Sequence, residues 1–133
     1  MSIAVLGIIK ESFQEMGLNY NFKRYKGKHK YPYFVGEYQE VESMHEDGMQ
    51  ETAFILTGFS RWEEGIDADL QLEEAKEKIA AYFPALGGKT VIADNGSAVA
   101  IFYAGSLANI PTGDNELEKL QINLTIKEWK VIK

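Results

Sequence analysis

Apolar residues recur at helical spacing in two stretches of the chain. In residues 2–16 they fall near one face of a helix, and in residues 70–83 a second apolar face alternates with charged positions. These two patterns predict two amphipathic helices. Candidate caps are Ser2 at the start and Gly17 at the end of the first helix, and Asp67 or Asp69 at the start of the second.

The other apolar stretches are rich in β-branched and aromatic residues, which is typical of strands. YPYFVGEYQEVE predicts a strand with Pro32 at its start, and ETAFILTGFSRW predicts the returning strand. KTVIADNGSAVAIFYAG predicts a hairpin around Asn95-Gly96. The strict alternation in EKLQINLTIKEW predicts the last strand, with a bulge near Glu128 that shifts the phase of Trp129.

The predicted order of elements is α-β-β-α-β-β-β. The basic segment between the first helix and the first strand is predicted to be a loop or a loosely paired ribbon. Because hairpins join most of the strands, we expect an α+β fold, with a largely antiparallel sheet of about five strands and two helices packed on one face. A chain of 133 residues, 45% of them apolar, can bury one core, so residues 1–133 are predicted to form a single domain.

The charge of the chain is unevenly distributed. The net charge is −6, but residues 23–30 contain five basic residues and no acidic one, which leaves −11 for the remainder. A chain this acidic is repelled by a long duplex, whereas two opposite patches attract each other between neighbouring copies. The absence of cysteine excludes disulfides and thiolate chemistry. The apolar stretch IAVLGII is too short to span a bilayer and lacks signal-peptide flanks, so no membrane contact is expected.

The sequence offers little for catalysis or nucleotide binding. It contains no glycine-rich phosphate loop of standard spacing, and the Gly-Gly-Lys at 87–89 is typical of a helix end. His29 and His45 are the only histidines, and no nucleophile-elbow pattern is present. We therefore expect no catalytic residue and no cofactor.

One acidic cluster is a weak candidate for metal binding. Glu42, His45, Glu46 and Asp47 lie close together in the sequence, and carboxylates with imidazole bind divalent ions. The cluster falls in a predicted hairpin turn, where the spacing has no helical register. We interpret it as a solvated acidic loop and expect no metal site.

The basic run in residues 23–30 is interleaved with aromatic residues between positions 20 and 33. Three interpretations are open: a nucleic-acid contact, a solvated loop, and a protein-contact surface, which we favour. Arg61-Trp62 is a second candidate, since an exposed Trp beside Arg is a frequent interface anchor, although Trp62 folding back onto the sheet fits equally well. The candidate interface residues are Lys23, Arg24, Lys26, Lys28, Lys30, Arg61 and Trp62.

Five stretches carry a resemblance to a known family: YPYFVGEYQEVES, ETAFILTGFSR, LEEAKEKIAAYF, KTVIADNGSAVAIFYAG and LQINLTIKEW. In their order along most of the chain they resemble the small tail-terminator and minor capsid (head–tail joining) proteins of tailed phages and prophages of Gram-positive bacteria. The resemblance implies an α+β subunit that forms a homo-oligomeric ring, often a hexamer. Such a ring caps the tail tube at its head-proximal end and docks to the head connector, without catalysis.

The resemblance also implies a location in the virion, or in the host cytoplasm during assembly. The run in residues 23–30 is more basic than the resemblance requires, so it is expected to face either DNA in the lumen of the oligomeric ring or a neighbouring subunit. The alternative is a small ligand- or nucleic-acid-binding α+β module that uses residues 20–33. An enzyme with a pocket between helix and sheet is the least favoured reading.

Overall fold

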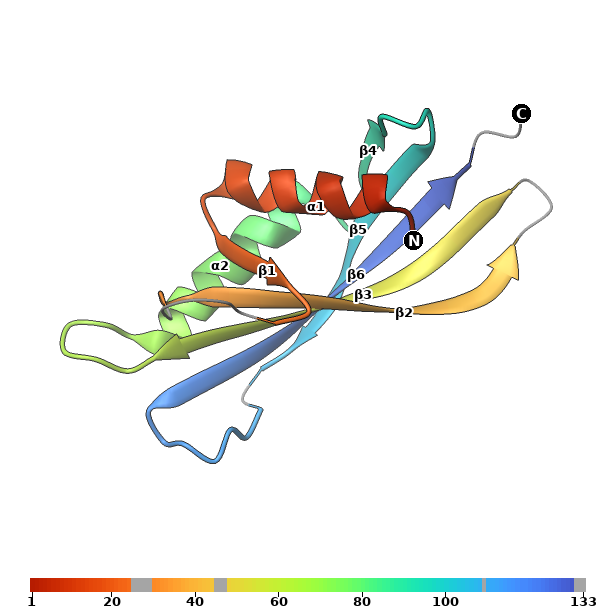
Figure 1. Cartoon of the computed structure of the whole chain (residues 1–133). Helices are drawn as coiled ribbons and strands as arrows, with labels where there is room; N and C mark the ends of the chain where they lie inside the picture. The colour runs from red at the N-terminus through yellow and green to blue at the C-terminus, as the bar shows by residue number, and fades with distance from the viewer. Residues whose placement is uncertain (25–29, 45–47, 109, 131–133) are drawn as a thin grey trace.

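The computed structural model describes residues 1–24, 30–44, 48–108 and 110–130 of the chain. The described residues form two helices and a six-stranded sheet (Figure 1). Their bounds are α1 (Ile3–Met16), β1 (Asn19–Phe22), β2 (Tyr33–Met44), β3 (Met49–Arg61), α2 (Ala68–Tyr82), β4 (Lys89–Ile92), β5 (Ala98–Leu107) and β6 (Leu117–Trp129).

The strands lie in the order β1-β2-β3-β6-β5-β4. β1 pairs parallel with β2, and every other pairing is antiparallel, which confirms the α+β fold and the largely antiparallel sheet. The expected strand count was wrong by one. Four residues of the predicted loop form β1, with Asn19 opposite Tyr33, so the order is α-β-β-β-α-β-β-β.

The predicted helix caps are confirmed at three positions. The Ser2 hydroxyl accepts a hydrogen bond from the N–H of Val5 at 3.3 Å, and Gly17 ends α1 in the left-handed conformation with φ 71°. Asp67 caps α2 by accepting from the N–H of Leu70 at 3.0 Å.

The hairpin predicted around Asn95-Gly96 is also present, between β4 and β5. The N–H of Ala93 donates to the carbonyl of Ser97 at 2.8 Å, and Gly96 adopts φ 86°, which a glycine adopts without strain. Pro32 immediately precedes β2, as expected. The hairpin turn predicted at the acidic cluster, which includes His45 and Asp47, lies partly outside the described residues.

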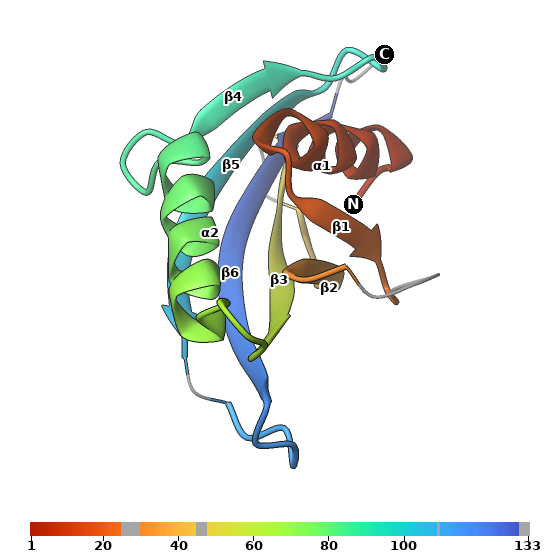
Figure 2. The ribbon, with the colours of Figure 1, turned by 90° about the vertical axis from the view of Figure 1, so that its left-hand side faces the viewer.

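Both helices pack on one face of the sheet, which curls around them (Figure 2). Two glycines let aromatic rings lie directly on the backbone of this face. A Cβ atom at Gly36 would meet the ring of Phe54 at 2.6 Å, and one at Gly58 would meet the ring of Phe34 at 2.5 Å. The largest fully buried side chains are Phe13, Phe34, Phe54, Phe83, Ile9, Leu56, Ile79, Ile101, Leu120, Ile122, Leu124 and Ile126.

The bulge predicted near Glu128 is wrong. β6 stays in register with β3 through Trp129, so Glu128 continues the core-facing alternation and is only 2% exposed. Its strand neighbour across the pair is Gln50, which is also buried. Neither Glu128 carboxylate oxygen nor the Gln50 amide oxygen has a hydrogen-bond partner within the described part of the chain. The irregularities lie instead in β2, between Glu40 and Met44, and in β5.

Candidate interaction surfaces

Arg61 is the last residue of β3, and its side chain is engaged within the molecule. Its Nη2 donates to Asp114 Oδ2 at 3.1 Å, and its Nη1 lies 3.7 Å from Glu116 Oε2. The guanidinium also lies 5.9 Å from the ring centroid of Tyr31. Hydrogen bonds to Tyr31 and then to Asp114 raise the pKa of Arg61. Arg61 therefore joins the β5–β6 loop to the chain just before β2.

Trp62 follows Arg61 and bonds to the same neighbouring chain segment. Its backbone N–H donates to the carbonyl of Glu116 at 2.7 Å, and its indole Nε1 donates to Glu118 Oε1 at 2.9 Å. The residue nevertheless remains 37% exposed. Trp62 is thus anchored along one edge of its ring, and part of its surface stays open to a partner.

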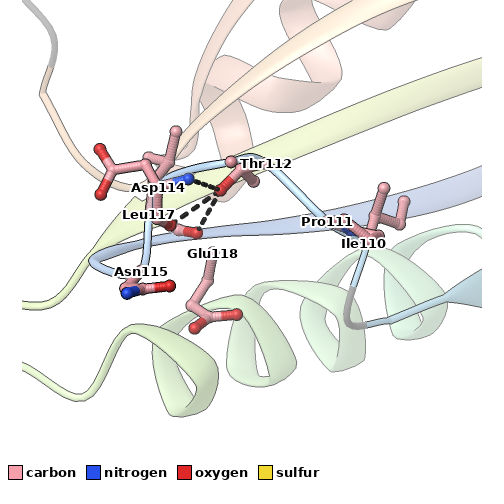
Figure 3. A pocket seen from close by; sticks show the side chains of 8 residues that line it. Ile110, Pro111, Thr112, Asp114, Asn115, Leu117 and Glu118 are labelled. Carbon is pink, nitrogen blue, oxygen red and sulfur yellow. Dashed lines mark hydrogen bonds between the residues drawn. The ribbon is translucent and has the colours of Figure 1, made fainter.

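The loop between β5 and β6 is held in shape by Thr112 (Figure 3). The Thr112 hydroxyl accepts from the N–H of Asp114 at 3.1 Å and lies within hydrogen-bond distance of the carbonyls of Asp114 and Leu117. The N–H of Glu116 in turn donates to Asp114 Oδ1 at 3.0 Å. This backbone hydrogen bond, and then Arg61, lower the pKa of Asp114.

A second acidic contact joins this loop region to α2. Figure 3 shows the side chain of Glu118 directed toward α2, where it meets Asp69. Burial raises the pKa of the Asp69 carboxyl, and the charge of Glu118 raises it further.

We call Arg61, Trp62, Asp114, Glu116 and Glu118 the Arg61 corner. A cavity of 370 Å³ lies beside it, lined by the loop from Ile110 to Glu118. The corner is acidic, because its single cation is outnumbered by carboxylates.

The basic segment begins at the end of β1, at one edge of the sheet. The N–H of Lys23 donates to the carbonyl of Gly36 at 2.7 Å, and the Lys23 ammonium lies 5.5 Å from the ring centroid of Phe22. Arg24 is exposed. Neither Lys23 nor Arg24 forms an ion pair with any residue that the structure describes. We call these two residues the basic edge.

The remaining candidates of the basic segment are only partly placed. The carbonyl of Lys30 accepts from Asn19 Nδ2 at 3.0 Å, and its side chain is exposed. Lys26 and Lys28 lie outside the described residues. The structure brings the end of this segment close to the Arg61 corner, because Tyr31 contacts Arg61.

The described aromatic residues between positions 20 and 33 pack against other aromatic rings of the protein. Three of them stack on rings elsewhere in the chain, with centroid distances of 4.7, 5.9 and 5.0 Å, and Tyr31 lies against Tyr33 at 5.4 Å. Such contacts occupy the ring faces that a base would need for stacking. The stacked pairs are Tyr20 with Phe13, Phe22 with Tyr38, and Tyr33 with Phe59.

The described residues contain no group of three or more His, Asp or Glu side chains arranged to hold a metal ion. His29 and His45, with most of the acidic cluster around His45, lie outside the described ranges. No helix in the described part of the chain has the length and apolar character needed to cross a membrane.

The acidic half of the Arg61 corner was not predicted from the sequence. Asp114 and Glu116 lie in the stretch between the predicted hairpin and the predicted last strand, and Asp114 is 53 positions from Arg61. The available signal was the acidic run GDNELE at the start of the last strand. That run indicates a negative turn, but not which cation it meets.

Comparisons with known proteins identify a shared fold. No family model matches the sequence, and no curated protein is significantly similar to it. A solved structure of a protein whose name states no function superposes with a TM-score of 0.61 and 13% sequence identity. The match covers 96% of this chain and 98% of the other. At this level of identity the similarity concerns the fold alone.

Proposed function

We propose that this chain is a non-enzymatic assembly subunit of a tailed-phage or prophage virion, a tail terminator or related head–tail joining protein. In this role, copies of the chain form an oligomeric ring that caps the tail tube and docks to the head connector. The proposal rests on the family resemblance of the sequence stretches and on one structural observation, the separation of charge across the sheet.

The charge separation places opposite signs on different sides of the molecule. The run of residues 23–30, which carries +5 in the sequence, begins with Lys23 and Arg24, and these two residues follow β1 at one edge of the sheet. Residues 63–82, which include α2, hold seven acidic and two basic residues, a net charge of −5. α2 packs on β3, β5 and β6, and Figure 2 shows it on the opposite side of the molecule from β1.

This arrangement suits head-to-tail association of identical copies. An oligomeric ring needs heterologous contacts, in which one patch meets a different patch on the next copy. Opposite fields on the two patches favour the correct encounter and fix its register. The stacked rings of Tyr20, Phe22 and Tyr33, which flank the basic run, support a protein contact over a base-stacking platform.

Negative-stain electron microscopy of the purified chain tests the proposal. We expect closed rings of uniform diameter. The alternative, a nucleic-acid-binding module, predicts single copies that are retained on single-stranded DNA at physiological salt. Single copies at every concentration would contradict the proposed function, and their retention on DNA would support the alternative.

A further inference from the structure

An apolar groove lies between α1 and β1, at the edge of the sheet that carries the basic residues. It has a volume of 340 Å³, and its lining includes Ile3, Leu6, Gly7, Lys10, Tyr20 and Phe22. Ile3 is 88% exposed, the second most exposed large apolar side chain among the described residues. An exposed apolar groove of this kind is typical of a contact site for another molecule.

The rim of the groove is positively charged. Lys10 is the only charged residue of the lining, and Lys23 and Arg24 directly follow Phe22. None of these three cations forms an ion pair within the described part of the chain. The groove therefore suits an apolar side chain that is flanked by carboxylates.

The chain itself carries such a surface, on the outer side of α2. Leu70 is 54% exposed, and Glu74 and Glu77 are exposed on the same helical face because they follow Leu70 by four and seven positions. The opposite face of α2 is buried against the sheet through Ala68, Leu72, Ala75 and Ile79. The outer face thus offers one apolar anchor beside two carboxylates.

We propose that the α1–β1 groove of one copy binds the outer face of α2 of the next copy, with Leu70 in the groove and Glu74 and Glu77 against the basic rim. This contact between copies rests on the proposed ring-forming function, and it identifies the two surfaces that would meet in the ring. The groove and α2 lie on different sides of one molecule, so each copy contributes one surface to each of two neighbours. Protein–protein interfaces commonly place an apolar anchor residue at the centre and polar or charged residues around it.

Two variants break the contact from opposite sides. Gly7→Trp fills the groove, and a side chain is accommodated there because a Cβ atom at Gly7 has no atom within 4 Å. Leu70→Asp removes the anchor at an exposed position. Matched controls are Gly7→Ala, which leaves the groove open, and Leu86→Asp, which changes a 93% exposed leucine outside the proposed contact. Circular dichroism establishes that each variant is folded.

The decisive experiment measures molar mass by light scattering for each variant and for their mixture. We expect Gly7→Trp and Leu70→Asp each to weaken self-association about tenfold or more, and the controls to match the wild type. An equimolar mixture should form dimers and stop there, because each pair retains one intact groove and one intact α2 surface. Wild-type assembly in both variants, or a mixture without dimers, would overturn the pairing alone. A wild-type chain that never associates would overturn the ring function as well.

Discussion

Arg61 and the basic edge are both cationic sites that the sequence marks as candidate contacts, but their charges have different surroundings in the structure. Arg61 is bonded to Asp114 and lies near Glu116, so its charge is neutralised inside the molecule. Lys23 and Arg24 have no carboxylate partner among the described residues. The ion pair of Arg61 stabilises the β5–β6 loop. The unpaired charges of Lys23 and Arg24 can attract a carboxylate of another molecule.

Glu128 has a third kind of environment, which differs from those of Arg61 and the basic edge. Its carboxylate is unpaired like the basic edge, but it is buried, so water cannot compensate for the missing partner. An unpaired charge at the surface attracts a partner at little cost to the fold, whereas an unpaired charge in the core lowers stability. The effect of an unpaired charge therefore depends on whether its side chain is accessible to water.

The largest expected effect concerns the basic edge. The double change Lys23→Glu and Arg24→Glu reverses its charge, and we expect self-association to weaken about tenfold or more, which corresponds to about 1.4 kcal/mol. Sedimentation equilibrium measures the association constant. Arg61→Gln is the matched control, because the Arg61 charge is already paired within the chain. If self-association weakened equally in both variants, this would contradict the claim that the two regions differ.

The next effect concerns stability. Glu128→Leu replaces a buried, unpartnered carboxylate by an apolar side chain, and we expect the free energy of unfolding to rise by about 1–2 kcal/mol. Urea denaturation at neutral pH measures the change. Glu51→Gln, at an exposed position of β3, should change stability far less. A destabilised Glu128→Leu variant would indicate that this carboxylate has a partner that stabilises the fold.

A smaller effect is expected at Trp62. Trp62→Phe keeps an aromatic ring but removes the donor to Glu118, and loss of one partly exposed hydrogen bond to a carboxylate costs about 1 kcal/mol. The same urea experiment measures this loss. Assembly should remain at the wild-type level, since the proposed contact uses other surfaces. Weakened assembly without loss of stability would instead make Trp62 an interface anchor.

The smallest effect depends on pH. The pKa of Asp114 lies below its ordinary value of 3.8, so its ionised form stabilises the fold above that pH, and this stabilisation is lost as the pH falls through the lowered pKa. Asp114→Asn should therefore have a slightly lower Tm than the wild type at pH 7. The difference should shrink once the pH falls below 3.8 and disappear when Asp114 is protonated in both states. A difference in Tm independent of pH would contradict the ion pair with Arg61.

Much of the fold could be predicted from the sequence, because periodic patterns and caps are local signals. The alternation from Leu120 to Ile126 and the caps at Ser2, Gly17 and Asp67 are examples. β1 could not be predicted in this way, since it has four half-buried residues without alternation and depends on a parallel partner. The false bulge at Glu128 arose because a carboxylate in the core face was not expected.

The candidate surfaces were less accessible to sequence reasoning. The sequence marks Arg61 and the basic run by residue type, but whether a cation is paired depends on contacts between distant segments. Asp114 reaches Arg61 only because β3 and β6 pair along their full length. The groove beside α1 depends in turn on β1, which the sequence pattern did not reveal.

The central claim is that copies of this chain assemble through surfaces of opposite charge. The most direct test is the molar mass of the wild-type chain by light scattering at about 0.05 M and about 0.5 M salt, since exposed charge pairs are screened as ionic strength rises. We predict an oligomer of one defined size at low salt that dissociates as the salt concentration increases. A monomer at both concentrations, or an oligomer indifferent to salt, would contradict the claim.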